Sequence, residues 1–260
     1  MAEPLRLLRD SFPDLPAFGT AVSEAILQRV AAGELPPTLR LHRPARELAF
    51  SKQDRLAPGF ERAVAAARAV GFEPVLRLAG GRAAAFHEGT LALARATPDP
   101  HPARNTRARF EEVSAIVTEA LRPLGVDARV GQVPGEYCPG AWSVNARGRV
   151  KLVGIGQRLI AGGAHVGVVI VVTDSALLRG ALEPVYEALE LDWDPATAGA
   201  VEDEAPGVTL GDVEDAILAE LSKRTPVEPS TLDAETLSLA ERLEGERRVL
   251  GARSADEPGG

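Results

Sequence analysis

Two long apolar runs separated by a short glycine-rich break constrain the fold of this chain more than any other feature. The runs span residues 150–160 and 164–172, are rich in β-branched side chains, and are separated by Ala161-Gly162-Gly163. β-Branched residues favour strands and glycines permit a tight turn, so the pattern predicts a β-hairpin. Lys151 opens the first run, and the only cysteine, Cys138, lies thirteen residues before it. A charged residue at this position is either a solvated strand end, which is the commoner case, or an active-site cation.

The remaining apolar side chains are spaced as in a series of helices and short strands. Helical spacing predicts helices over residues 20–32, 58–70, 103–121 and 175–189. Short apolar or alternating segments predict strands over residues 39–43, 47–51, 75–78 and 128–130. The prolines and the glycine within residues 1–19 predict a loosely ordered arm. Because the strands and helices form no regular βαβ repeat, we expect an α+β fold with a mostly antiparallel mixed sheet flanked by helices.

The charge distribution separates the front of the chain from its end. Residues 1–182 carry a net charge of +6 and residues 183–260 one of −14. Residues 196–206 are small and acidic and contain Pro and Gly, which predicts a linker between a domain over 1–195 and an acidic tail over 207–260. In the tail we expect two helices and a disordered end, at residues 210–223, 231–250 and 251–260. The tail is either a packing appendage or a segment that folds over the basic front and regulates access to it.

Composition excludes several classes of protein. An apolar fraction of 45% and a charged fraction of 25% are those of a soluble globular protein. No run of eighteen apolar residues and no apolar signal-peptide core are present, so we expect no membrane span. A single cysteine excludes an internal disulfide and suits the cytoplasm. An aromatic content of 4% and the lack of a known motif argue against nucleic acid. The four histidines form no metal-spaced set with the cysteine, so we expect no metal site.

A second stretch, residues 77–93, contains an ordered set of polar and glycine residues. In chain order these are Arg77, Gly80, Gly81, Arg82 and His87, with a short apolar strand expected over residues 83–86, before the histidine. On their own, paired glycines usually mark a tight turn, and a lone histidine is usually a structural residue. Taken in order with Gly148, Arg149, Lys151, Gly154, Gln157 and His165, the two stretches resemble the lipoate–protein ligase and octanoyltransferase family of the biotin/lipoate protein ligase superfamily. The resemblance covers residues 39–172.

The resemblance implies the site residues and favours one branch of the family. It implies that Lys151 is catalytic and that the substrate is bound by Arg77, Gly80, Gly81, Arg82, His87, Gly154, Gln157 and His165. ATP-using ligases usually have three consecutive glycines in the turn, whereas this chain has Gly80-Gly81-Arg82 and so resembles the cysteine-dependent octanoyltransferases. Those enzymes carry a nucleophilic cysteine shortly before the lysine, as Cys138 is placed here. Two departures are Ile155-Gly156, where the family often has Ser-Ala, and Glu88, where it often has aspartate.

The activity implied by the resemblance is the transfer of an octanoyl or lipoyl group to a lysine of a lipoyl-domain protein. The acceptor would be a 2-oxoacid dehydrogenase E2 or the glycine cleavage H protein, and the donor an acyl-carrier protein or a lipoylated domain. Cys138 would form an acyl thioester, and Lys151 would lower the pKa of the thiol and hold the acyl carbonyl. The amides of Gly80-Gly81-Arg82 would stabilise the oxyanion, and His87 or His165 would relay a proton. This mechanism requires no cofactor.

Two alternatives remain open on the sequence. In an ATP-dependent lipoate–protein ligase, Lys151 would contact an acyl-adenylate, ATP and Mg²⁺ would be required, and Cys138 would be a bystander. In a non-catalytic protein that binds an acyl group or a lipoyl domain, neither residue would matter to turnover. A lone cysteine is also commonly a small buried hydrophobe.

Overall fold

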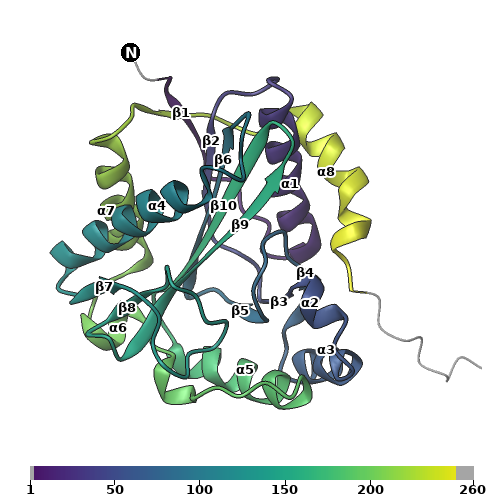
Figure 1. Ribbon diagram of the computed structural model, residues 1–260, viewed down its shortest axis with the longest axis vertical. Coiled ribbons are helices and arrows are strands. Elements are labelled where there is room, and N and C mark those ends of the chain that lie inside the picture. The colour runs from purple at the N-terminus through teal and green to yellow at the C-terminus, as the bar shows by residue number, and fades with distance from the viewer. Residues whose placement is uncertain (1–2, 250–260) are drawn as a thin grey trace, which may run out of the picture.

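The fold is built around an eight-stranded sheet in which the predicted hairpin is central. The computed structural model describes residues 3–249. The strand order is β11-β1-β2-β6-β10-β9-β8-β7, with the bounds β1 (Leu5–Leu8), β2 (Thr38–His42), β6 (Thr90–Pro98), β7 (Ala128–Val130), β8 (Val144–Ala146), β9 (Val150–Ile160), β10 (Gly163–Val171) and β11 (Val227–Pro229). β9 and β10 pair antiparallel from Ile160 and Gly163 at the turn to Val153 and Ile170, which confirms the hairpin (Figure 1). Only the pairs that involve β1 are parallel, so the sheet is mixed and mostly antiparallel, as expected.

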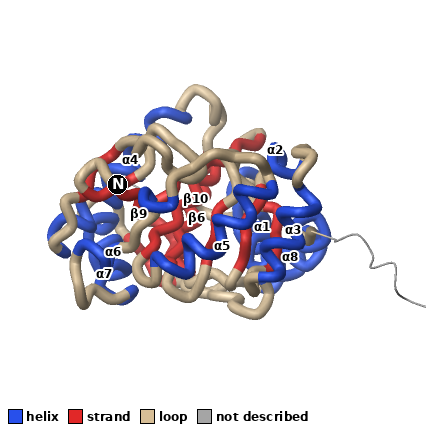
Figure 2. Tube along the Cα trace, turned by 90° about the horizontal axis from the view of Figure 1, so that it is seen from below, coloured by secondary structure: helices blue, strands red, loops and turns tan. Residues whose placement is uncertain are grey.

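Helices cover both faces of this sheet. One face carries large apolar side chains such as Leu39 and Val168, which pack against α4 (Thr106–Leu121) and α7 (Leu210–Ser222). The opposite face lies toward α1 (Pro16–Ala31) and a three-stranded sheet. That second sheet has the order β4-β3-β5, with the bounds β3 (Glu47–Phe50), β4 (Glu73–Leu76) and β5 (Ala84–Phe86). Figure 2 shows the strands between helices on either side.

The second sheet has its own apolar core. Leu48 and Phe50 of β3 pack against α3 (Phe60–Ala69) and α5 (Ser175–Ala188). Because side chains alternate along a strand, Glu47 and Ala49 point to the other side, toward α1 and the main sheet. A short helix, α2 (Lys52–Arg55), follows β3 and is capped by a reciprocal pair of hydrogen bonds between Ser51 and Asp54. The two sheets therefore enclose the space in which the candidate site lies.

The N-terminal segment differs from the predicted loose arm. Residues Leu5–Leu8 form β1 and pair with β2 on one side and β11 on the other. Leu5, Leu7 and Leu8 are buried, so apolar burial orders this segment. The prolines lie outside the strand, and Pro16 is the first residue of α1, where its missing N–H costs nothing.

Residues 196–206 and the tail are packed onto the rest of the protein. The segment predicted as a linker contains α6 (Val201–Glu204), follows the short 3₁₀ helix η2 (Pro195–Thr197), and buries Ala198, Ala200 and Val201. In the tail, β11 joins the main sheet, α7 packs on α4, and α8 (Ala234–Arg247) packs on α1. The division into a domain and a tail stays a prediction, and the end predicted as disordered, 251–260, lies outside the described residues. None of the described helices is long and apolar enough to cross a membrane.

Candidate active site

A cavity of about 530 Å³ lies between the two sheets and α1. Its floor is the face of β6, β10 and β9 turned away from α4, and the side chains there are small: Ala92, Ala94, Gly154, Gly156 and Gly167. The strand register places Ala94, Gly167 and Gly156 in one row across the sheet. A volume of this size is typical of small-molecule sites. Small floor residues under a largely apolar lining suit an extended acyl chain.

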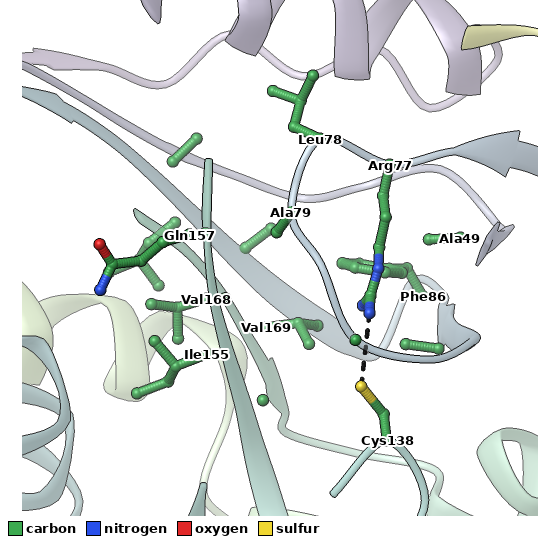
Figure 3. A pocket seen from close by; sticks show the side chains of 18 of the residues that line it. Ala49, Arg77, Leu78, Ala79, Phe86, Cys138, Ile155, Gln157, Val168 and Val169 are labelled. Carbon is green, nitrogen blue, oxygen red and sulfur yellow. Dashed lines mark hydrogen bonds between the residues drawn. The ribbon is translucent and has the colours of Figure 1, made fainter. Parts of the chain in front are cut away.

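Cys138 lies at the edge of this cavity, in the loop between β7 and β8. Its Sγ accepts a hydrogen bond from the Arg82 backbone N–H at 3.2 Å and one from Arg77 Nη2 at 3.5 Å (Figure 3). Its own N–H donates to the Tyr186 hydroxyl at 2.8 Å, and that hydroxyl donates to the Ala83 carbonyl at 2.9 Å. The cysteine has a φ of 42°, a left-handed conformation that a non-glycine residue adopts only when its surroundings hold it there.

The surroundings of the thiol favour the thiolate. Burial raises the pKa of Cys138, but the charges of Arg77 and Lys151 and the two hydrogen bonds to Sγ lower it by more. The net result is a pKa below the ordinary value of a cysteine. A partly exposed thiol with a lowered pKa is the environment of reactive cysteines, and a buried structural cysteine has the opposite shift.

The predicted glycine pair allows the guanidinium and the thiol to meet. Gly81 has a φ of +105°, and a β-carbon there would lie 2.4 Å from Arg77 Nη2 and 2.8 Å from Cys138 Sγ. Both distances are shorter than a real β-carbon contact, so any side chain at position 81 would force Arg77 or Cys138 to move. At Gly80 a β-carbon would meet nothing within 4 Å, although its carbonyl accepts from Arg77 Nη2 at 2.6 Å. The two glycines are therefore not equivalent, and only Gly81 is required by close approach.

Lys151 is buried and bound entirely by the cysteine loop. Its Nζ donates to the carbonyl of Cys138 at 2.7 Å, to the carbonyl of Tyr137 at 3.0 Å and to Glu136 Oε1 at 3.2 Å. A lysine ammonium has three N–H donors, so all three are used. The side chain is 2% exposed. Lys151 thus fixes the cysteine loop, and it acts on the thiol through its charge and without direct contact with Sγ.

Glu136 is a central residue of the site that the sequence interpretation missed. Its side chain is fully buried and accepts from the Val133 N–H, the Gly140 N–H, the Ser143 hydroxyl and Lys151 Nζ, at 2.7 to 3.2 Å. The carboxylate compensates the lysine and ties both sides of the loop together. The sequence did contain a signal for this residue. A buried lysine requires a compensating negative charge, and Glu136 is an acid only two residues before the cysteine.

Three further predicted residues line the cavity with different roles. Gly154 lies beside the Lys151 side chain, and a β-carbon there would make only an ordinary van der Waals contact with Cε, at 3.8 Å. Gln157 binds α4: its Oε1 accepts from Arg109 Nε and its Nε2 donates to the Thr106 carbonyl, both at 2.8 Å. In Figure 3 its side chain points away from Cys138. His165 is buried over Gly167, and burial lowers its pKa to about 4.

His87 and the Arg82 side chain are not brought to the thiol. His87 is buried in the turn between β5 and β6, where its Nδ1 accepts from the Gly89 N–H at 3.0 Å, and it does not line the cavity. This placement is that of a turn-forming residue. The Arg82 guanidinium forms an ion pair with Asp54 at 3.5 Å, so only its backbone N–H reaches Sγ. Within residues 3–249, no group of three or more His, Cys, Asp or Glu side chains is placed to hold a metal.

Comparison with known proteins identifies the family of this chain and several curated relatives. The model of the lipoyl protein ligase A/B catalytic domain matches residues 15–222. An octanoyl-GcvH:protein N-octanoyltransferase of Anoxybacillus flavithermus is 30% identical over 168 residues, which are 64% of this chain and 60% of the relative. The enzyme of that name from Bacillus velezensis is 28% identical over 72% of this chain and 65% of its own length. The chain thus spans less than two thirds of the curated relatives it matches.

Solved structures share the fold at lower identity. A T. acidophilum protein assigned as a lipoate protein ligase, with bound lipoic acid, is 21% identical, with a TM-score of 0.75 over 94% of this chain and 96% of its own. A lipoate-protein ligase A bound with ATP is 22% identical, with a TM-score of 0.76 over 94% and 95%. At this identity the likeness establishes the fold alone.

Proposed function

The chain belongs to the lipoyl protein ligase A/B catalytic-domain family, and we propose that it transfers an octanoyl or lipoyl group to a lysine of a lipoyl-domain protein through a thioester on Cys138. The observation that carries this proposal is the thiol itself. It lies at the edge of an apolar cavity, between the Arg77 guanidinium and the Arg82 amide, with its pKa lowered. An ATP-dependent ligase has no use for an activated cysteine at this position.

The reaction has two acyl transfers. The Cys138 thiolate attacks the carbonyl carbon of an acyl thioester, a new C–S bond forms, and the donor thiol leaves as a thiolate that takes up a proton. The acceptor lysine amine then attacks the enzyme thioester, a C–N bond forms, the amine loses a proton, and the Cys138 thiolate is released. A thioester retains enough reactivity toward amines to make the second step accessible.

The groups around Sγ have separate tasks in these steps. Arg77 and the Arg82 amide stabilise the thiolate both as nucleophile and as leaving group. Arg77 Nε is buried with no partner of its own, and we assign it, with the guanidinium charge, to the oxyanion of the tetrahedral intermediate. Lys151 and Glu136 are positioning residues that hold the loop carrying Cys138.

The relatives and the charge distribution support a choice of acceptor and donor. The curated relatives are named for GcvH, and one related structure is that of a bi-partite lipoate protein ligase and its E2 lipoyl domain from Thermoplasma acidophilum. We extend this to the glycine cleavage H protein or a 2-oxoacid dehydrogenase E2 as acceptor, and to an acyl-carrier protein or a lipoylated domain as donor. The basic front of the chain suits acidic partners of this kind. We further propose that the transfer needs no cofactor and takes place in the cytoplasm.

Intact-protein mass spectrometry tests the thioester directly. The protein is mixed with octanoyl-loaded carrier protein without ATP, and we expect one acyl adduct that hydroxylamine removes. The adduct should be absent from Cys138→Ala, whose folding is checked by thermal unfolding. If the acceptor is modified only with free acid and MgATP, and equally by Cys138→Ala, the chain is a ligase and the proposal fails. Failure of both assays would point to a binding protein.

A further inference from the structure

The backbone of Cys138 is held at both of its polar groups by buried side chains. Its carbonyl accepts from Lys151 Nζ at 2.7 Å, and its N–H donates to the Tyr186 hydroxyl at 2.8 Å. Lys151 lies on β9 and Tyr186 on α5, so the two side chains reach the cysteine from separate parts of the fold. The Lys151 ammonium binds only the cysteine loop, whereas the Tyr186 hydroxyl also binds a segment on the other side of the thiol.

That segment is the turn that carries Arg82. The Tyr186 hydroxyl accepts from the Cys138 N–H and donates to the Ala83 carbonyl at 2.9 Å. Ala83 directly follows Arg82, whose own N–H donates to Cys138 Sγ at 3.2 Å. Two hydrogen-bonded connections therefore join the same two segments, one through the phenol oxygen and the other through the sulfur. The connection through Tyr186 sets the gap that the hydrogen bond from the Arg82 amide to the sulfur must span.

The Tyr186 ring is fixed in place by its own surroundings. It is buried in the apolar core of the second sheet. The Trp193 ring packs against it with centroids 5.4 Å apart, and also packs edge-on against Tyr137, the residue before the cysteine, at 6.0 Å. A tyrosine has only two side-chain torsions, so a buried tyrosine ring is a rigid support. The cysteine loop therefore takes its position from the hydroxyl, because the hydroxyl has little freedom to follow the loop.

The hydroxyl acts through its position and not as an acid or base. Burial, and after it the charge of Cys138, raise the pKa of Tyr186 well above its ordinary value. The proton therefore stays on the phenol oxygen, which continues to donate it to the Ala83 carbonyl. Tyr186 does not line the cavity, so it does not contact an acyl chain there.

The hydrogen bond to Tyr186 also determines what the Cys138 amide can do. In many enzymes that form acyl intermediates, the backbone N–H of the nucleophile donates to the oxyanion. Here that N–H is already bound to the phenol oxygen. The left-handed φ of 42° at Cys138 is unfavourable for a non-glycine residue, and it persists only if bonds such as this one hold it. Stabilisation of the oxyanion is therefore left to other donors, such as Arg77 Nε.

We propose that Tyr186 is a positioning residue of the acyl transfer, whose hydroxyl holds Cys138 in its left-handed conformation and at the distance from which the Arg82 amide stabilises the thiolate. This inference rests on the proposed function for the use that is made of the thiol. Without the hydroxyl, the Cys138 N–H and the Ala83 carbonyl lose their shared partner, and the loop is free to move away from the turn. The thiolate then loses a charge-assisted hydrogen bond, while the cavity floor is unchanged.

Tyr186→Phe tests the proposal, because it removes the hydroxyl and keeps the ring. The ionisation of the thiol is measured from the pH dependence of iodoacetamide alkylation, and acyl loading from the mass assay at several concentrations of octanoyl-loaded carrier protein. We expect the alkylation midpoint to move to higher pH and the maximal loading rate to fall about tenfold or more, because a hydrogen bond to a charged group is weakened. The half-saturating donor concentration should change by less than about threefold, because a buried residue outside the cavity does not contact the donor.

Thr118→Val is the matched control for the loss of a buried hydroxyl. Thr118 of α4 is buried, donates to the Ser114 carbonyl at 2.7 Å and does not line the cavity. Its variant should keep the wild-type midpoint and loading rate. Thermal unfolding checks that both variants are folded at the assay temperature. If Tyr186→Phe is not folded, Tyr186→4-aminophenylalanine takes its place: the amino group still donates to Ala83 but accepts only weakly from the Cys138 N–H, so the midpoint should shift in the same direction.

The two measurements separate this inference from the proposed function. If the wild type loads an acyl group but Tyr186→Phe keeps the wild-type midpoint or the wild-type loading rate, the transferase stands and the inference fails. If the midpoint shifts in Tyr186→Phe but the wild type forms no acyl adduct, Tyr186 does hold the thiol and the transferase fails.

Discussion

Lys151 Nζ donates to the backbone carbonyl of Cys138 at 2.7 Å, so the lysine holds the backbone of the cysteine and not its sulfur. The same ammonium pairs with the buried Glu136 carboxylate. The lysine therefore has a structural and an electrostatic task, and the two can be separated experimentally.

Removing Lys151 should destabilise the protein and deactivate the thiol. Lys151→Met leaves the Glu136 carboxylate buried without its cation, which typically costs about 3–5 kcal/mol of unfolding free energy. The double variant Lys151→Met/Glu136→Gln should recover much of this stability, but its thiol pKa should remain above that of the wild type. Denaturant unfolding and the pH dependence of iodoacetamide alkylation measure the two effects. Lys223→Met, at an exposed lysine, is the control and should change stability by less than about 1 kcal/mol. Recovery of the wild-type thiol pKa in the double variant would contradict the electrostatic role.

The two glycines of the turn should respond very differently to alanine. Gly81→Ala introduces a β-carbon where Arg77 Nη2 and Cys138 Sγ lie, at a positive φ, so we expect acyl loading to fall by at least about tenfold. Gly80→Ala meets open space and should load at nearly the wild-type rate. The rate of acyl-adduct formation by mass spectrometry compares them. Equal rates in the two variants would show that Arg77 and Cys138 need not approach as closely as they do here.

The Arg77 guanidinium should set the pH dependence of the thiol. It is the largest of the influences that lower the Cys138 pKa, so Arg77→Leu should move the alkylation midpoint to higher pH. In the wild type the rate of acyl loading should rise with pH and level off once the thiolate is fully formed. Arg62→Leu removes an exposed arginine that pairs with Glu190 and is not among the groups acting on the thiol, so it should leave the midpoint unchanged. A midpoint shared by wild type and Arg77→Leu would remove Arg77 from the activation of the thiol.

Glu47 should make the protein less stable as the pH rises. Burial raises its pKa in the folded protein to about 8, from 4.5 in an unperturbed carboxyl. Between these values the folded state binds more protons at this residue than the unfolded state, so its contribution to the unfolding free energy decreases with pH. Glu47→Gln should therefore gain stability relative to the wild type between pH 5 and pH 8. Parallel denaturant unfolding of the two proteins at several pH values would show this, and a constant difference would contradict it.

Local patterns predicted some parts of this protein and could not have predicted others. The β9–β10 hairpin follows from β-branched runs around a glycine turn, and its two strands are neighbours in the sequence. β1 could not be recognised, because four residues among prolines become a strand only when β2 and β11 flank them. Segment 196–206 looks polar and small, yet Val201 is drawn into the core by the strands around it.

In the candidate site, too, some residues could be predicted from the sequence and others could not. The motif order indicated Arg77, Gly81, Cys138 and Lys151, and the structure brings these four together. His87 matched the motif equally well but shapes a turn, because sequence order does not reveal which way a side chain points. Glu136 was missed because its role depends on how the cysteine loop folds back on itself, which brings Gly140, Ser143 and Lys151 to its carboxylate.

The described part of the tail does not cover the cavity. In residues 207–249, β11, α7 and α8 all pack on the outer parts of the fold, and none of these residues lines the cavity. The described part of the tail instead packs against the rest of the protein, as expected for a packing appendage.

The thiol is surrounded by groups that come from three separate stretches of chain: Arg77 and the Arg82 amide, Tyr186 of α5, and Lys151 of β9. During synthesis, Cys138 leaves the ribosome well before Tyr186 does, and at that time it is an ordinary thiol with an ordinary pKa. Its reactivity appears only once both sheets have docked and α5 has closed over β5. Acylation at Cys138 would therefore mark only chains that have completed folding, and immature copies would withdraw no acyl groups from the cell's supply.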